Sequence, residues 1–400
     1  MQLKIISNIL ENIDHHGTVD RDQPDLYYDY RGKAKGCDEA ARTLPSKISV
    51  VTENKGKEIE LSLNSNTTID YEDIKVGERE LSKPYLDALY KVHSKDHVEG
   101  LKSTSLQVKL GECNQEFGNE ASVWSGTYRA AISSVKASLR CVDLIVEDPN
   151  NQTRAFANVW PAGHHAEGSS PDSSNDIAMG FCYLSNASIA AIYARDLGFR
   201  TLVIDIDNHS GNGTRKSLMN KDGLAVIDLV YCSPFDEKSS RYLDGFYDSK
   251  KEKVIGIARE FPYRHDDPIL GTKQHPVYSA SNILSLEFRG KEYREKEYRE
   301  EITRVEPAAS PNEILDRYNK EAMPWIEKFN PEIIIWSIGV DSAFDDPLGA
   351  LGFAPSTFYE IIKKTSDHFP TAKVMGVMEG GYKAENWKNC LWPALYGLVS

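Results

Sequence analysis

The sequence predicts an α/β fold built on a mostly parallel sheet. Short apolar runs rich in Val and Ile alternate with segments of helical periodicity in the second half of the chain. Runs of this kind are typical of strands buried on both faces, and strands that alternate with helices form parallel sheets. Two of the runs lead directly into aspartate residues, as expected for a site at the carboxyl ends of parallel strands.

The elements follow from these patterns in chain order. Apolar runs predict strands at residues 201–206, 224–232, 253–258, 332–340 and 373–378. Helical spacing predicts helices at 121–147, 185–197, 311–329 and 357–368. The last helix has Thr357 followed by Glu360, which is the pattern of a capping box with Thr357 at the N-cap. Residues 1–80 are polar and irregular, with a clear loop at 64–68.

Composition permits one large domain or two, and it narrows the class of function. The chain has 400 residues, 40% of them hydrophobic, and a net charge of -13. That length supports an ample core, and the acidic balance argues against nucleic-acid binding and fits cationic ligands or solubility alone. No run approaches membrane-spanning length and no secretory signal is evident, so we expect a soluble intracellular protein, cytoplasmic or nuclear.

Cysteine usage predicts neither a disulfide framework nor a thiolate zinc site. The six cysteines are widely scattered and form no C-x-x-C pair. They are typical of reduced, mostly buried thiols. Their positions are Cys37, Cys113, Cys141, Cys182, Cys232 and Cys390.

The stretch DIDNHSGNGT at 205–214 carries two candidate metal ligands. Because an extended backbone sends residues two apart to the same face, Asp207 and His209 can face one metal ion where the predicted strand ends. Asp341 follows the run 332–340 in the same way and is the candidate third ligand. Two carboxylates and one imidazole leave a coordination position open, as catalytic zinc requires. Such a pattern in isolation is more often a solvated strand end or a helix N-cap.

Five separated motifs occur in an order that resembles the zinc-dependent deacetylase superfamily, which comprises the zinc-dependent histone deacetylases, class II among them, and the acetylpolyamine amidohydrolases. They are GHHAE at 163–167, GFCYLSN at 180–186, DIDNHSGNGT at 205–214, GVDSAFDDP at 339–347 and MEGGY at 378–382. The resemblance covers most of residues 85–400. It implies the three-layer arginase/deacetylase fold, with a central sheet between helices, in a single deacetylase domain over residues 1–400 whose first 80 residues diverge.

The resemblance also implies roles for the tandem histidines. His164 and His165 match the family pair, and His165 is the expected acid–base that takes a proton from water and gives it to the departing amine. Asp205 matches the partner of His164, and Asn212 matches the partner of His165. Because Asn212 is uncharged, we expect the His165 imidazole to be less readily cationic and a better base than with an aspartate partner.

Further roles come from the same resemblance. Tyr382 matches the tyrosine whose hydroxyl donates to the developing oxyanion. Phe181 matches one wall of the tunnel that holds an acyl-lysine stem, and Gly180 and Gly380 are assigned to substrate binding with it. The implied cofactor is one catalytic Zn²⁺, which polarises an amide carbonyl and lowers the pKa of its bound water.

The resemblance further implies a structural K⁺ near Asp205 and Ser233. Three departures from the family pattern limit which of the family's features can be transferred to this chain. Ser210 stands where the family usually has a second histidine, which alters the packing behind the ligand. Extra polar residues between His165 and Gly180 indicate a different tunnel rim. The facing tunnel wall has three candidates, Phe235, Tyr242 and Phe246.

A charged segment interrupts the pattern between residues 262 and 309. It contains KEYREKEYREE at 291–301 and is longer than the loop the family usually carries there. A solvated helix or flexible insertion is the commoner interpretation, and a partner-binding element is the alternative. No function is assigned to it.

We expect zinc-dependent hydrolysis of acetyl-lysine side-chain amides in proteins, with histones among the candidate substrates. An acetylpolyamine amidohydrolase is the enzymatic alternative, and an inactive deacetylase-like scaffold that binds partners is the alternative of another class. The presence of all the chemical residues argues against the scaffold. The expected partners are therefore acetylated proteins, peptides or polyamines, without direct contact to nucleic acid or membranes.

Overall fold

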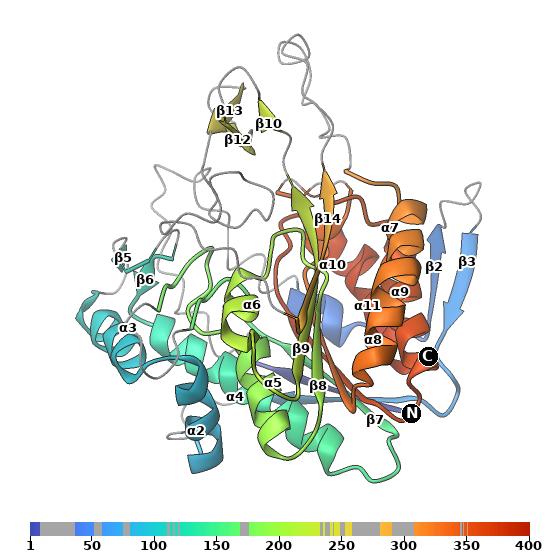
Figure 1. Cartoon of the computed structure of the whole chain (residues 1–400), viewed down its shortest axis with the longest axis horizontal. Helices are drawn as coiled ribbons and strands as arrows, with labels where there is room; N and C mark the ends of the chain where they lie inside the picture. Colours follow the sequence, from blue (N-terminus) through green and yellow to red (C-terminus); the bar gives the residue numbers. More distant parts are fainter. Residues whose placement is uncertain are drawn as a thin grey trace.

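A computed structural model places an eight-stranded sheet at the centre of the protein (Figure 1). The structure describes residues 1–8, 37–51, 58–74, 81–109, 113–114, 117–118, 121–168, 176–232, 235–236, 241–242, 244–248, 253–257, 281–289, 308–344, 346, 348–349 and 351–400.

All neighbouring strands of this sheet run parallel. In sheet order they are β14 (Ile283–Arg289), β9 (Leu224–Cys232), β8 (Thr201–Asp205), β15 (Ile333–Ile338), β16 (Lys373–Met378), β7 (Thr153–Asn158), β1 (Gln2–Ser7) and β4 (Thr68–Asp73). Because the strands are parallel, the segments that follow β8, β15 and β16 all leave the same edge of the sheet.

Helices cover both faces of the sheet. The helices are α2 (Lys83–Val92), α3 (Lys95–Gln107), α4 (Thr127–Val146), α5 (Asn186–Asp196), α6 (Asn212–Leu218), α7 (Pro311–Arg317), α8 (Met323–Phe329), α9 (Pro355–His368), α10 (Asn386–Asn389) and α11 (Leu391–Val399). One hydrophobic core lies under α9 and α11, and the other lies under α4 and α5 (Figure 1). This is the predicted three-layer α/β arrangement.

Alternation of side chains along each central strand produces the two cores. In β15, Ile334 and Trp336 belong to the core under α9 and α11, whereas Ile333 and Ile335 belong to the core under α4 and α5. All four side chains are completely buried. A continuous apolar run is therefore needed for a strand in this position, which is why the sequence pattern identifies it.

The five predicted strands are present, and four of them, β8, β9, β15 and β16, belong to the main sheet. The predicted helices are also present, but the one expected over 121–147 begins only at Thr127, because residues 123–124 form a short strand. The predicted helix over 311–329 is divided into α7, a π-helical turn at Tyr318–Ala322, and α8. Pro324 in the first turn of α8 has no N–H to donate to an α-helical hydrogen bond. A wider π-helical turn before it continues the helix in the same direction.

The strand predicted at 253–258 is not part of the main sheet, and that expectation was wrong. It is β13 (Lys253–Ile257), which pairs antiparallel with β12 (Asp244–Asp248). Three further antiparallel pairs lie outside the main sheet: β2 (Lys47–Val51) with β3 (Glu58–Ser62), β5 (Cys113–Asn114) with β6 (Val123–Trp124), and β10 (Phe235–Asp236) with β11 (Arg241–Tyr242). A short apolar run indicates a strand but does not identify its partner.

Four strands of the main sheet were not predicted: β1, β4, β7 and β14. Residues 1–80, expected to be irregular, supply β1 and β4, and residues 37–42 are helical. The 262–309 segment contains β14, so it does not lie wholly outside the sheet; its remaining residues, apart from 281–282 and 308–309, are outside the described ranges. In β7 the apolar signal is weak because the small residues Ala155 and Ala157 face the closely packed α4.

The start of α9 also differs from the prediction. The helix begins at Pro355 and its N-cap is Ala354, so Thr357 is the third helical residue. The Thr357 hydroxyl oxygen accepts a hydrogen bond from the N–H of Ala354 at 3.2 Å. Proline is favoured at the first helical position. The helix therefore starts at Pro355, two residues before the predicted start at Thr357.

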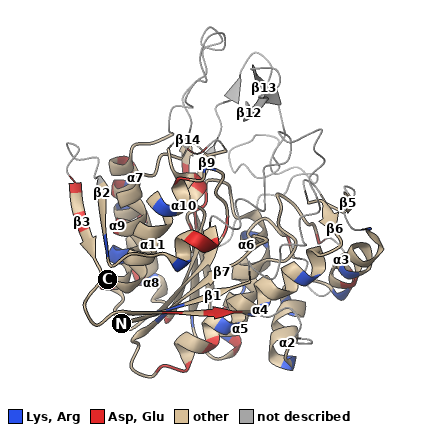
Figure 2. Cartoon of the chain, turned by 180° about the vertical axis from the view of Figure 1, so that it is seen from behind, with Lys and Arg blue, Asp and Glu red and all other residues tan. Residues whose placement is uncertain are grey.

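Other sequence expectations concern the thiols, the membrane and the surface. Cys37, Cys113, Cys141, Cys182 and Cys390 are in no disulfide, and all except Cys113 are buried. The side chain of Cys232 lies outside the described residues. Within the described ranges, no helix has both the length and the apolarity to cross a bilayer. Basic and acidic residues are interspersed along the described helices and strands seen in Figure 2. The division into domains stays a prediction.

Candidate metal centre and active site

The three candidate ligands meet at the carboxyl ends of two neighbouring strands. Asp207 and His209 follow β8, and Asp341 lies in a 3₁₀ turn after β15. Ligand atoms of all three lie within 4.8 Å of one another. Nδ1 of His209 is 3.1 Å from Oδ1 of Asp207 and 3.2 Å from Oδ2 of Asp341. The pairing of β8 with β15 brings together residues that are more than 130 positions apart in the chain.

Burial and unsatisfied polarity make this cluster suitable for a cation. Asp207 and Asp341 are fully buried, and Oδ2 of Asp341 is buried without a hydrogen bond. The His209 side chain is 29% exposed, so the cluster opens on its side. Buried carboxylates require a compensating positive charge, and two carboxylate oxygens with one imidazole are ligands that zinc accepts. The residues present therefore fit a divalent metal.

The pKa shifts in this cluster show an excess of negative charge. Burial, followed by the neighbouring Asp207 carboxylate, raises the pKa of Asp341 to about 7. Burial alone would lower the pKa of His209, but the hydrogen bond with Asp207 and the attraction of the Asp207 and Asp341 carboxylates raise it to about 10. The carboxylates thus stabilise a positive charge at this point, whether a proton or a metal ion supplies it.

A second cluster, His164, Cys182 and Glu379, has metal-ligand atoms equally close together but is already satisfied. Glu379 accepts hydrogen bonds from the N–H of Gly163 at 2.8 Å, the N–H of His164 at 3.1 Å and the Ser337 hydroxyl at 2.9 Å. Burial raises the pKa of the Cys182 thiol well above its usual value, so it is protonated. Glu379 therefore holds the histidine loop rather than a metal.

Each tandem histidine has the partner that the sequence predicted. Nδ1 of His164 is 3.1 Å from Oδ2 of Asp205, and Nδ1 of His165 is 2.6 Å from Oδ1 of Asn212. The two imidazole centroids are 4.1 Å apart, and all four side chains are buried. Nε2 of His164 also lies 3.7 Å from Oδ1 of Asp207, which places this pair directly beside the ligand cluster.

The two histidines differ in their charge. Burial would lower the pKa of His164, but the carboxylates of Asp207 and Asp205 raise it well above its usual value. Burial lowers the pKa of His165 well below its usual value, and the positive charges of His164 and His209 add to this effect. His165 is therefore neutral and can accept a proton, whereas His164 favours the cationic form.

Tyr382 is placed beside the ligand cluster by a buried carboxylate. Its ring centroid is 6.5 Å from that of His209, and the two rings are nearly perpendicular, at 85°. Oδ2 of Asp346 accepts hydrogen bonds from the N–H groups of Tyr382 at 2.9 Å and Lys383 at 3.1 Å. Asp346 lies in the motif GVDSAFDDP, for which only Asp341 was given a predicted role, although an aspartate beside a turn is a common backbone acceptor.

The Gly180–Phe181 turn packs against His165. Both residues have positive φ, 51° for Gly180 and 66° for Phe181, and such a value is uncommon for an aromatic residue. A Cβ on Gly180 would lie 2.6 Å from Cδ2 of His165, so only glycine fits against this imidazole. The side chains of the three candidates for the facing tunnel wall, Phe235, Tyr242 and Phe246, lie outside the described residues.

The histone deacetylase domain family matches residues 51–398. The chain belongs to the histone deacetylase family. It is 27% identical over 303 residues to histone deacetylase 6 of Caenorhabditis elegans, and 26% identical over 302 residues to histone deacetylase 5 of Arabidopsis thaliana. Each match covers 74% of this chain but only 26% and 38% of those proteins, so the chain spans well under half of either relative.

Solved structures give the same fold. The HDA15 HD domain superposes with a TM-score of 0.65 at 18% identity, covering 100% of this chain and 90% of that one. The acetylpolyamine aminohydrolase of Burkholderia pseudomallei superposes with a TM-score of 0.63 at 17% identity and covers 99% of both chains. The three-layer arginase/deacetylase fold is therefore shown for this chain.

The departure from the family pattern at Ser210 is accommodated by a buried network of its own. The Ser210 hydroxyl donates to Oδ2 of Asp228 at 2.8 Å, and Nη1 of Arg215 lies 3.2 Å from the Ser210 hydroxyl oxygen and 3.4 Å from the Asp228 oxygen. All three residues are buried. The K⁺ expected near Asp205 and Ser233 stays a prediction, because Ser233 lies outside the described residues.

Gly380 lies against both carboxylate ligands. Its N–H donates to Oδ2 of Asp207 at 2.8 Å. A Cβ at this position would lie 2.3 Å from Oδ2 of Asp341 and 2.5 Å from Oδ2 of Asp207. The glycine is therefore required by the close approach of the ligand oxygens. The structure places it against the two candidate ligands, whereas its assignment to substrate binding stays a prediction.

We expect Gly380→Ala to lower zinc affinity about 10- to 100-fold, because displaced ligands no longer converge on one point. Competition with a fluorescent zinc chelator measures this affinity. Gly100→Ala is the matched control, since a Cβ there meets nothing closer than 3.9 Å, and it should bind zinc as the wild type does. Equal zinc affinity in the two variants would contradict the assignment of these carboxylates as ligands.

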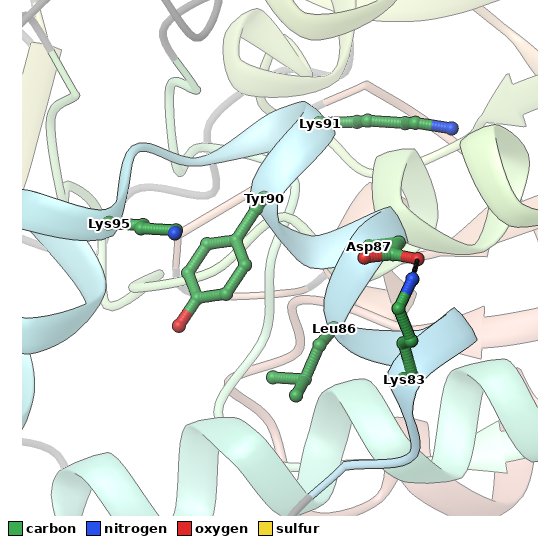
Figure 3. A pocket seen from close by; sticks show the side chains of 6 residues that line it. All are labelled: Lys83, Leu86, Asp87, Tyr90, Lys91 and Lys95. Carbon is green, nitrogen blue, oxygen red and sulfur yellow. Dashed lines mark hydrogen bonds and ion pairs between the residues drawn. The ribbon is translucent and has the colours of Figure 1, made fainter.

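A hollow of about 410 Å³ lies on α2, and none of its lining residues belongs to the candidate site. Lys83 forms an ion pair with Asp87 on one side of the hollow (Figure 3). The Lys95 ammonium lies 5.5 Å from the centroid of the Tyr90 ring. Lys91 is paired with Asp196. These contacts satisfy the lysines locally and provide no catalytic group.

Proposed function

We propose that this chain is a zinc-dependent deacetylase that hydrolyses acetyl-lysine side-chain amides in proteins, with histones among its substrates. The observation that carries the proposal is the convergence of Asp207, His209 and Asp341 beside two buried histidines. Membership of the histone deacetylase family supports it, as does the likeness to histone deacetylase 6 of Caenorhabditis elegans. The acidic chain would in addition attract lysine-rich substrates.

Zinc would be held by Asp207, His209 and Asp341. When bound, it supplies Lewis acidity that polarises an amide carbonyl and makes a water molecule easier to deprotonate. The neutral His165 accepts the water's proton, since Nδ1 faces Asn212 and the other ring nitrogen is left as the acceptor. The water oxygen adds to the carbonyl carbon as this proton leaves.

The remaining side chains act on the negative charge and on the leaving group. The Tyr382 hydroxyl donates a hydrogen bond to the carbonyl oxygen as it becomes an oxyanion. The His164 imidazolium, which Asp205 stabilises, adds positive charge nearby. His165 then returns its proton to the lysine nitrogen as the C–N bond breaks, and the products are a lysine amine and acetic acid, which releases its remaining proton to become acetate.

An acetylpolyamine is the second candidate substrate. The superposition with an acetylpolyamine aminohydrolase covers 99% of both chains, and the net charge of -13 also suits a polycationic ligand. Both substrates present an acetylated primary amine on an alkyl stem, so the same ligands and histidines could act on either. The difference between them lies in the rim of the site.

A parallel assay of the zinc-loaded protein separates the candidates. Acetyl-lysine peptides and N-acetylspermidine are supplied at equal concentrations, and acetate release gives kcat/KM for each. We expect a higher kcat/KM for the peptides. A higher value for the polyamine would replace the proposed substrate, and binding of acetyl-lysine peptide without release of acetate would indicate a scaffold.

A further inference from the structure

Glu167 of the GHHAE motif lies directly behind the His165–Asn212 pair. Its side chain is only 3% exposed. Oε1 accepts a hydrogen bond from Nδ2 of Asn212 at 3.0 Å, and Oε2 accepts one from Nζ of Lys216 at 2.9 Å. Asn212 and Lys216 are four residues apart on α6, so one turn of that helix presents an amide and an ammonium to the same carboxylate.

The carboxylate determines which way the Asn212 amide points. An ionised carboxylate only accepts hydrogen bonds, so the NH₂ group of Asn212 must face Glu167. The same NH₂ also faces the backbone oxygen of His165 at 3.3 Å. Reversal of the amide would place its oxygen against two buried acceptors and leave it without donors, which is unfavourable.

The amide in turn determines the position of the proton on His165. Oδ1 of Asn212 lies 2.6 Å from Nδ1 of His165 and cannot donate a hydrogen bond. Nδ1 must therefore carry the hydrogen of a neutral imidazole, and Nε2 is left as the proton acceptor. Without this constraint both tautomers are available, and only one of them suits a base that acts through Nε2.

We propose that Glu167, held by Lys216, is a positioning residue that fixes the Nδ1–H tautomer of His165 through the amide of Asn212. The expected effect of Glu167 on the reaction rate rests on the proposed deacetylase function, whereas the tautomer of His165 can be observed without any substrate. Lys216 satisfies the second carboxylate oxygen and supplies the matching positive charge in a site where its own side chain is 19% exposed.

Glu167→Gln tests this arrangement because an amide has one accepting oxygen where the carboxylate has two. Two donors, Nδ2 of Asn212 and Nζ of Lys216, then compete for that oxygen. The ammonium forms the stronger hydrogen bond, so the new NH₂ group faces Asn212 and favours reversal of its amide. Adding Lys216→Met removes the competitor, so the new oxygen can turn back to Asn212.

Long-range ¹H–¹⁵N spectra of zinc-loaded, ¹⁵N-histidine-labelled protein report the tautomer, with the His165 signal assigned from His165→Gln. We expect the Nδ1–H tautomer in the wild type, its loss as the major form in Glu167→Gln, and its return in the Glu167→Gln/Lys216→Met double variant. An unchanged tautomer in the single variant, or a double variant as altered as the single one, would overturn the proposal.

Kinetics provide the second readout. On an acetyl-lysine peptide, kcat of Glu167→Gln should fall about 10- to 100-fold with KM within about twofold, and the double variant should recover most of the loss. Glu321→Gln, which removes a surface carboxylate bonded to Arg317 at 2.7 Å, should behave as the wild type. If the wild type released no acetate while the tautomer shifted as expected, the deacetylase proposal would fail and the assignment of Glu167 would stand.

Discussion

Replacing either carboxylate ligand should leave a folded protein without zinc and without activity. In Asp207→Ala or Asp341→Ala only one carboxylate and one imidazole remain, which is too few for a stable zinc site. Disturbing just the outer partners of a ligand reduces metal affinity or activity about 10- to 100-fold, so loss of a ligand should exceed a hundredfold. Zinc content by mass spectrometry and acetate release measure the two effects.

The fold should survive because each substitution removes the repulsion between two buried carboxylates, and Asp207→Ala in addition loses only the hydrogen bonds from the N–H groups of His209 and Gly380. Asp341 is buried beside Asp207, and this neighbour raises the pKa of Asp341 further. Circular dichroism should therefore be unchanged. Glu321→Ala, at an exposed carboxylate in the π-helical turn, is the control for loss of an acidic residue. Full zinc occupancy in both ligand variants would show that the ligands were assigned wrongly.

Tyr382→Phe should reduce kcat about a hundredfold or more while substrate affinity changes little. The ring keeps its place beside His209, and the Asp346 carboxylate still accepts the N–H groups of residues 382 and 383, so only the hydroxyl donor is removed. A donor needed most in the transition state affects kcat more than binding. Steady-state kinetics on an acetyl-lysine peptide provide both values.

A matched variant distinguishes loss of the hydroxyl from movement of the turn. Asp346→Asn keeps Tyr382 but weakens the acceptor of two backbone N–H groups, so it should shift the turn and raise KM as well as lower kcat. Near-normal kcat in Tyr382→Phe with unchanged zinc content would reduce Tyr382 to a packing residue. The carbonyl would then be activated without it.

Local sequence pattern was enough to predict the ligand candidates and the core strands next to them. Asp207 and Asp341 each follow a mostly apolar run, and parallel pairing of these two runs brings their carboxyl ends to one edge. The histidine partners Asp205 and Asn212 were predicted from the order of motifs and lie where expected. The chemical roles of these residues stay predictions.

Other interactions of the site depend on the orientation of backbone N–H groups and side-chain amides, which the sequence alone does not give. Glu379, Asp346 and Glu167 were all inside quoted motifs, but each acts through N–H groups or amides whose orientation is set by the folded backbone. The place of β1 between β7 and β4 was also missed, because strand order in a sheet does not follow chain order. Only half of the residues of β1 are apolar, so the sequence shows little of the periodicity expected of a strand.

The most direct test of the account is stepwise zinc addition to the chelated protein during hydrolysis of an acetyl-lysine peptide. Because Asp207, His209 and Asp341 form one ligand cluster, acetate release should be absent at first, rise in proportion to zinc and level off at one equivalent per chain. Full activity in the chelated protein, or a rise that also occurs in Asp341→Ala, would contradict a single catalytic zinc held by these residues.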